Sequence, residues 1–337
     1  MAHDLFPPWS AVDYTPPGRA VTGWGPMRIM RRSFRHRPRR MFRNLRLYRL
    51  HSTWPDSEAA LAERLEDAAF TPCGAYSERS SGWEAPTGDD SDPLCRRVAG
   101  ADLLRLRSQT RLLPAAAVNE ALEDRLAEFR SRTSRDPSRR EKRQLKDEIH
   151  AELMPKALLK SERVRGFCLI QEKLIGIDTA AEAQAERFLD KLRDALGSLQ
   201  VTPLKFRQPV GGLIHRVFLG EGPREFRPGR EAKMQDPAAG SATVNWMDID
   251  LTDDDVRRHV RSGLKVTRLG LVYDDIASLV LDQDGVVRKL KLQGMDAVED
   301  AGDDEDPLAR LDAEFVLLTG VVRRLVGSLE KALGGLD

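Results

Sequence analysis

Strand-like and helix-like spacings of hydrophobic residues follow one another along the chain from residue 42 onward. Residues 42–50 alternate between apolar and polar as a strand does, and Leu61, Leu65 and Ala68 recur at helical spacing within 56–70. A loop region with a short strand at Trp83 follows. The pattern then predicts a strand at 103–107, helices over 118–129 and 138–154, a buried hairpin at 164–178, and a helix at 181–196 ended by Gly197.

The second half of the chain is less regular. Residues 205–245 are ambiguous, because prolines and paired glycines break any long element there. Thr252 is expected to cap a helix through Val260, because the three aspartates after it suit the positive end of the helix dipole. The rest of the pattern predicts three antiparallel strands at 266–273, 276–281 and 286–292, an acidic loop at 299–306, a short buried run at 315–318, and a last helix over 322–329 closed by Gly334 and Gly335. We therefore expect an α+β fold of antiparallel sheets with packed helices.

The helices over 118–129 and 138–154 are joined by a short polar connection, as in an αα-hairpin. The second of them carries Leu145, Ile149 and Leu153 on one stripe. Basic residues fill its first half: Arg139, Arg140, Lys142, Arg143 and Lys146. This pattern predicts that the hairpin projects as an arm.

Composition describes a globular chain of 337 residues, with 41% hydrophobic and 32% charged residues. Uncharged stretches are far shorter than the ~20 apolar residues that a membrane span requires, so no membrane partner is expected. The net charge of +1 hides an uneven distribution. Residues 1–40 and 105–165 each carry a net +6, whereas 250–337 carry a net −7.

Residues 1–40 combine six prolines with an arginine-rich end and little apolar periodicity, which is typical of a disordered basic extension. This extension has two readings, a nucleic-acid arm or a leader upstream of a true start at Met41. It lacks the apolar segment of a secretory signal. Cys73, Cys95 and Cys168 are odd in number and have no C-x-x-C spacing, so a reducing, cytoplasmic environment without disulfides or structural zinc is expected.

Common catalytic motifs are absent from the sequence: there is no Walker A loop, G-x-G-x-x-G, H-E-x-x-H or G-x-S-x-G segment. We expect no enzyme, no cofactor and no metal site. One alternative stays open, because Asp253, Asp254 and Asp255 are residues of the kind that hold Mg²⁺ for phosphodiester cleavage. A role at the start of a helix, where carboxylates stabilise the positive end of the dipole, also explains why these three aspartates are present.

The basic half of the arm also has two interpretations. It is a phosphate-contacting face, or it is an ordinary solvated helix whose charges pair at i,i+4. Three acidic residues, Glu141, Asp147 and Glu148, reduce the positive charge of this helix. The sequence contains no motif that recognises particular bases. A further alternative is a protein-binding adaptor without DNA binding, in which the acidic C-terminal part binds a basic partner.

Short segments dispersed over the chain carry a resemblance to a known family. They are 42–50, 69–74 with 82–83, 112–114, 145–148, 153–155, 196–199 with 203–204, 266–269 and 318–320. In their order and spacing from about 41 to 335, these segments resemble the bacterial recombination-associated protein RdgC family.

The resemblance implies a non-enzymatic, nucleoid-associated protein. It implies a ring-shaped homodimer that encircles double-stranded DNA without marked sequence preference and restrains RecA-promoted strand exchange, with the helical arms helping to close the ring. In this chain the resemblance implies an RdgC-like fold over 41–337, with the helical arm at about 112–160 and a central and base α+β region over 161–337. The family's closing contact is an apolar residue that falls on Leu158 here. Some relatives carry an aromatic residue there, so Leu158 keeps the apolar character but not the size.

The resemblance also bears on which residues are expected to contact DNA. Relatives can carry a basic run before Asp250, whereas this chain has Trp246, Met247, Asp248 and Ile249, so a contact there stays open. From charge and position, the residues expected to contact phosphates are Arg139, Arg140, Lys142, Arg143, Lys146, Lys205 and Arg207.

Overall fold

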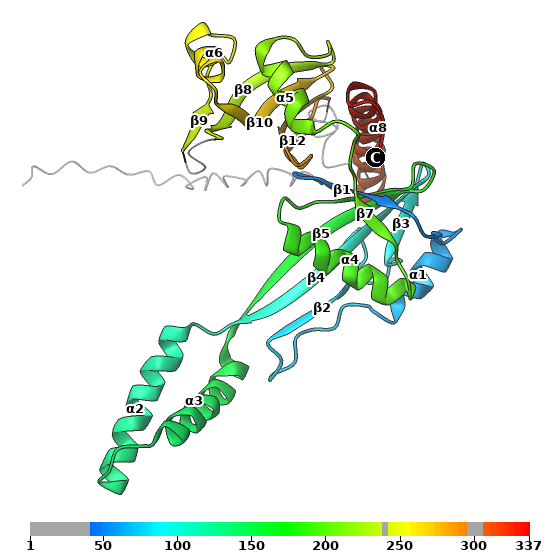
Figure 1. The fold of residues 1–337 in the computed structure, drawn as a ribbon. Helices are drawn as coiled ribbons and strands as arrows, with labels where there is room; N and C mark the ends of the chain where they lie inside the picture. The colour runs from blue at the N-terminus through cyan, green and yellow to red at the C-terminus, as the bar shows by residue number, and fades with distance from the viewer. Residues whose placement is uncertain (1–40, 238–241, 295–305) are drawn as a thin grey trace, which may run out of the picture. The chain divides into compact units, whose positions relative to one another are not determined.

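Two antiparallel sheets with packed helices make up the fold, so the α+β class expected from the sequence is confirmed (Figure 1). The computed structural model describes residues 41–237, 242–294 and 306–337. The basic extension 1–40 and most of the expected acidic loop at 299–306 therefore lie outside the described residues.

The first sheet has the strand order β2-β4-β5-β6-β1-β7, and β3 pairs with β4. Its strands are β1 (Arg46–Leu50), β2 (Arg79–Trp83), β3 (Cys95–Val98), β4 (Ala101–Leu112), β5 (Leu158–Leu169), β6 (Leu174–Ile177) and β7 (Val201–Pro203). Residues of α1 (Glu58–Glu66) and α4 (Glu182–Leu196) pack against one face in a hydrophobic cluster. A Cβ at Gly166 would lie 2.4 Å from Cζ of Phe188, so α4 packs where β5 has no side chain.

The second sheet has the order β12-β11-β10-β8-β9. Its strands are β8 (Phe226–Gln235), β9 (Thr243–Met247), β10 (Lys265–Tyr273), β11 (Ala277–Asp282) and β12 (Val287–Leu292). The helices α5 (Val210–Leu219), α6 (Asp254–Arg261) and α8 (Pro307–Ala332) contribute to one hydrophobic cluster with this sheet. That cluster also includes Leu103 and Phe167 of the first sheet.

The helices α2 (Ala115–Thr133) and α3 (Arg139–Leu153) pack against each other, and the short helix η1 (Met154–Lys156) follows them. They connect β4 to β5 (Figure 1). These two strands have twelve residues each and pair along their whole length, from Ala101 opposite Leu169 to Leu112 opposite Leu158. Only Val118 of α2 and Ile149 of α3 are buried. The two helices thus bury little beyond their contact with each other.

Two expectations from the sequence are wrong. The cap of α6 is Asp253, whose carboxylate accepts a hydrogen bond from the backbone N–H of Asp255, while the hydroxyl of Thr252 donates to Asp250. The expected buried run at 315–318 and last helix belong to one helix, α8. Residues 205–245, which the sequence left ambiguous, contain α5, β8 and part of β9.

Candidate nucleic-acid interface

The helical hairpin of α2 and α3 is organised by polar contacts at its turn. Ser138 caps α3 by accepting a hydrogen bond from the Glu141 backbone N–H, and the Glu141 carboxylate accepts one from the Ser138 backbone N–H. Arg135 donates two hydrogen bonds to the same carboxylate, at 2.9 and 2.6 Å. These contacts lower the pKa of Glu141 to about 2, and the hydrogen bond from Arg135 is the largest cause. The start of α3 is therefore fixed by residues next to it in the sequence.

One face of α3 carries four cations at the spacing i, i+3, i+4 and i+7: Arg139, Lys142, Arg143 and Lys146. We call these residues the α3 basic stripe. All four are exposed, and none forms a hydrogen bond or ion pair with a residue in the described part of the chain. Lys142 helps to lower the pKa of Asp136, although the main cause is the hydrogen bond from Arg130.

Arginines of the neighbouring helix and turn behave differently. Arg125 pairs with Glu152 at 3.1 Å, Arg130 with Asp136 at 2.7 Å, and Arg132 with Glu128 at 3.7 Å. The hairpin thus pairs these three arginines with acids and leaves the stripe available to an outside anion.

The remaining candidates lie at different places relative to this stripe. Arg140 is three residues before Arg143, so it adjoins the edge of the stripe, and both line a shallow surface groove with Asp147. Lys205 and Arg207 follow β7, where their main chains bond to the C-terminal residues: the Lys205 carbonyl accepts from Asp337, and the Arg207 N–H donates to Gly335. Their side chains are exposed, but they belong to the edge of the first sheet and not to the hairpin.

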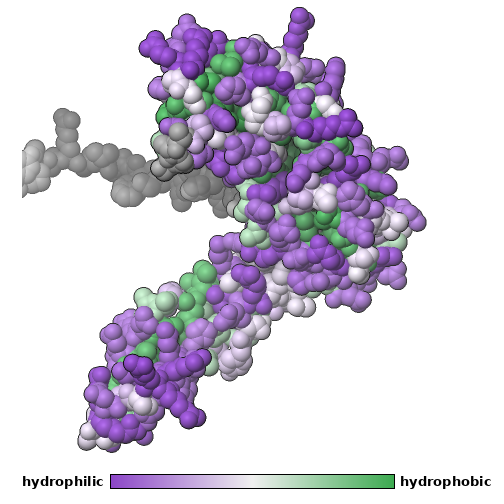
Figure 2. All heavy atoms as spheres, viewed as in Figure 1, coloured by the Kyte–Doolittle hydropathy of each residue, from purple (hydrophilic) through white to green (hydrophobic). Residues whose placement is uncertain are grey.

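An apolar patch lies where the hairpin meets the sheet. Leu158 is 77% exposed, and Leu112, its partner in the β4–β5 register, is 48% exposed. Leu159 is 46% exposed. Figure 2 shows hydrophobic residues on the exposed surface of the hairpin among mainly hydrophilic ones. Adjacent exposed leucines of this kind favour a contact with another surface.

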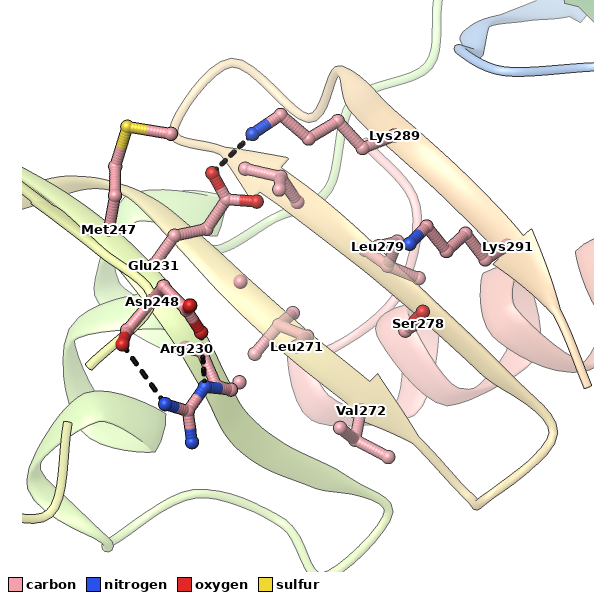
Figure 3. Close-up of a pocket in the computed structure, with 13 residues that line it drawn as sticks. Arg230, Glu231, Met247, Asp248, Leu271, Val272, Ser278, Leu279, Lys289 and Lys291 are labelled. Carbon is pink, nitrogen blue, oxygen red and sulfur yellow. Dashed lines mark hydrogen bonds and ion pairs between the residues drawn. The ribbon is translucent and has the colours of Figure 1, made fainter. Parts of the chain in front are cut away.

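Sequence reasoning missed a groove of about 470 Å³ on the second sheet (Figure 3). Its floor includes Gly229 and Gly270, where a Cβ would come within 3.0 Å of the facing strand. Two ion pairs lie at its edges, Lys289 with Glu231 at 2.5 Å and Arg230 with Asp248 at 2.7 Å, so most of its charge is already balanced. The segment 246–249, whose role the sequence left open, contributes Met247 and Asp248 to this groove.

The aspartates considered for metal binding have other partners. Asp253 caps α6, Asp254 pairs with Arg261 at 3.6 Å, and Asp255 pairs with Arg258 at 2.7 Å. Within the described ranges, no group of three His, Cys, Asp or Glu side chains is placed to hold a metal ion. The local structure of α6 therefore explains the acidic run without a cation.

None of the described helices is both long enough and apolar enough to cross a bilayer.

The chain is similar to known proteins over nearly all of its described part. A family described as "Putative exonuclease, RdgC" matches residues 41–336. The recombination-associated protein RdgC of Halorhodospira halophila (strain DSM 244 / SL1) is 34% identical over 298 residues, which cover 87% of this chain and 98% of that protein. Proteins of the same name from Shewanella sp. (strain ANA-3) and Shewanella oneidensis are 33% and 32% identical, each over 88% of this chain and 98% of the relative. The resemblance expected from dispersed segments is confirmed.

Proposed function

The chain belongs to the RdgC family, and on that premise we propose that it binds double-stranded DNA without sequence preference, as a homodimer closed around the duplex. In this proposal the protein is nucleoid-associated, catalyses no reaction and restrains RecA-promoted strand exchange by occupying the same duplex. The relatives' shared name supports a role in recombination.

The α3 basic stripe is the observation that carries the DNA-binding part of the proposal. Four exposed cations without a partner in the described structure lie on one helical face, while Arg125, Arg130 and Arg132 of the hairpin are paired with acids. A duplex presents one negative charge per ~1.7 Å of its axis, and each phosphate that a cation neutralises releases condensed counterions. Such contacts require no particular base.

Self-association is supported by the exposed leucines at the base of the hairpin. An isologous two-fold contact uses the same patch on both subunits, so in this proposal the apolar surface around Leu158 packs against its own copy. Closing a ring around DNA would prevent lateral escape and allow weak phosphate contacts to hold the duplex. The helical arm is the element that we propose makes this closing contact.

A nuclease is the second candidate function, because the family's description contains the word exonuclease. The residues of the described structure that are suited to metal binding, Asp253 to Asp255, are capping or ion-paired. Incubation of linear and supercoiled DNA with Mg²⁺ or Mn²⁺ separates the two functions. We expect the wild-type protein to leave the DNA intact. Cleavage by the wild-type protein that is lost in the variant Asp254→Ala would establish the nuclease.

Gel shifts on unrelated duplexes across a series of salt concentrations test the main proposal. Wild-type protein should bind all duplexes similarly, with log K falling linearly against log salt. The variant Arg143→Gln with Lys146→Gln removes two stripe cations and should reduce the steepness of that slope by about 2. A flat wild-type plot would exclude phosphate-dominated binding.

The matched control is Lys191→Gln with Arg193→Gln, which removes two cations from α4 that pair with Asp194 and Asp190. This control should leave the slope unchanged. If the stripe variant and the control behave alike, α3 is not the DNA contact. In a RecA strand-exchange assay, wild-type protein should slow exchange and the stripe variant should slow it less.

A further inference from the structure

Four arginines of the first sheet lie on one face of the long β4–β5 pair. Arg105 faces Arg165 across the strands, and Arg107 faces Arg163. Side chains at alternate positions of a strand point to the same face, so all four share the face that Leu103 and Phe167 occupy further along. The strand pairing thus places four like charges side by side, which is unfavourable unless anions balance them.

Glu84, which directly follows β2, is the carboxylate at the centre of this arginine cluster. It is 8% exposed and pairs with three guanidinium groups: Arg105 at 2.6 Å, Arg163 at 2.7 Å and Arg107 at 3.6 Å. The single negative charge of Glu84 therefore lies among three positively charged guanidinium groups. Asp178 and Glu314 also interact electrostatically with Arg165.

The cluster is both positively charged and partly dehydrated. Burial is the main cause that lowers the pKa of Arg105 and of Arg165. The Nε atoms of Arg107 and Arg165 are buried without a hydrogen-bond partner in the described structure. A buried donor left unpaired costs about 1–3 kcal/mol, so such groups call for an explanation.

Solvent reaches the cluster through two of its members. The side chain of Arg163 is 43% exposed and that of Arg107 is 26% exposed, whereas Arg105 is 13% exposed. Glu84 fixes Arg163 through Nε, and the ring of Phe70 lies 4.2 Å from the Arg107 guanidinium carbon. Both guanidinium groups are thus held in place before any ligand arrives.

We propose that this arginine cluster binds phosphate groups of the DNA backbone, with Arg107 and Arg163 making the contacts and Glu84 holding them in position. The inference rests on the proposed function and adds a second set of contacts, on the sheet rather than on α3. A guanidinium offers a planar fork of donors that matches two phosphate oxygens, and an orientation fixed in advance reduces the entropy lost on binding. A phosphate also supplies the negative charge that Glu84 alone does not.

Duplex binding across a salt series tests this inference with Arg107→Gln combined with Arg163→Gln. We expect affinity to fall by about tenfold or more, and the log K against log salt slope to become shallower by about 2. Arg163→Gln alone is the safer variant, because Arg105 still pairs with Glu84, and it should make the slope shallower by about 1. The control is Arg193→Gln, since Arg193 is 44% exposed and also pairs with one carboxylate, Asp190.

Inorganic phosphate supplies a second measurement. At equal ionic strength, phosphate should raise the melting temperature of the wild-type protein more than chloride does, and Arg163→Gln should remove that difference. Wild-type DNA binding with an unchanged slope in Arg163→Gln would overturn the inference and leave the proposed function standing. Phosphate-specific stabilisation without DNA binding would overturn the proposed function and show that the cluster takes free phosphate. Neither DNA binding nor a phosphate effect would overturn both.

Discussion

Asp102 and Arg97 form an ion pair across the β3–β4 hairpin, at 2.6 Å, in which the Asp102 side chain is completely buried. The guanidinium contacts both carboxylate oxygens, and Asp102 also accepts a hydrogen bond from the indole N–H of Trp54 at 2.6 Å. Arg97 in turn donates to the carbonyls of Pro55 and Asp56. This pair ties the segment before α1 to the first sheet.

Removing the buried carboxylate should therefore destabilise the protein strongly. Asp102→Ala leaves Arg97 and Trp54 without their acceptor, and we expect a loss of about 3 kcal/mol in the free energy of unfolding. Urea denaturation measures this loss. The adjacent pair Arg96 with Asp312 is the comparison, because its side chains are 31% and 25% exposed. Asp312→Ala should cost about 1 kcal/mol or less; equal losses would contradict the role of burial.

The hairpin should lose stability in acid through Glu141. Its pKa is lowered to about 2, first by the hydrogen bond from Arg135 and then by Ser138, from an ordinary value of 4.5. Because the folded-state pKa is depressed, this contribution is complete above pH 4.5 and is lost as the pH falls towards 2. The gap in melting temperature between wild type and Glu141→Gln, followed by circular dichroism, should shrink over that interval. A gap independent of pH would contradict this account.

Two glycines should respond in opposite ways to alanine. A Cβ at Gly176 would lie 2.1 Å from Cζ of the buried Phe167 ring, so Gly176→Ala should destabilise the protein by about 1–3 kcal/mol. Gly327 is exposed on α8, and a Cβ there meets nothing within 4 Å. Gly327→Ala should stabilise the helix by up to about 1 kcal/mol. Thermal unfolding of both variants checks the contrast, which fails if both change stability in the same direction.

Leu158 should matter for self-association and not for folding. Its side chain is 77% exposed, so Leu158→Glu removes little buried surface from the isolated chain. We expect an unchanged melting temperature at low protein concentration and at least a tenfold weaker dimer in sedimentation equilibrium. Thr110→Glu is the control, since Thr110 lies two residues before Leu112 on the same strand. Dimers of normal strength in Leu158→Glu would place the contact elsewhere.

Sequence patterns predicted the elements whose signals are local. The helices α2 and α3 follow from periodic apolar residues and from Ser138, which caps α3, and the meander of β10, β11 and β12 follows from alternation. The cap of α6 was assigned to the wrong residue because Thr252 and Asp253 are both good capping residues. Which one caps depends on backbone angles that sequence spacing does not reveal.

The candidate site was predicted in part. The stripe on α3 could be found because residues three and four apart on a helix share a face. Arg140 adjoins the stripe for the same reason, because it lies three residues before Arg143. The arginine cluster was missed, although arginines at alternate positions 105 and 107, and again at 163 and 165, were a visible signal. Only the pairing register brings the two groups together.

The sequence by itself determined the family, the α+β class and the helical hairpin, because each is encoded by contacts between residues close in the chain or by segments that keep their order. Tertiary structure decided which charges are already paired and which remain available. Arg130 and Lys146 carry the same charge in the sequence, yet among the described residues only Arg130 forms an ion pair with an acid. Charge neutralisation depends on distances of a few ångströms, and those distances exist only once the chain has folded.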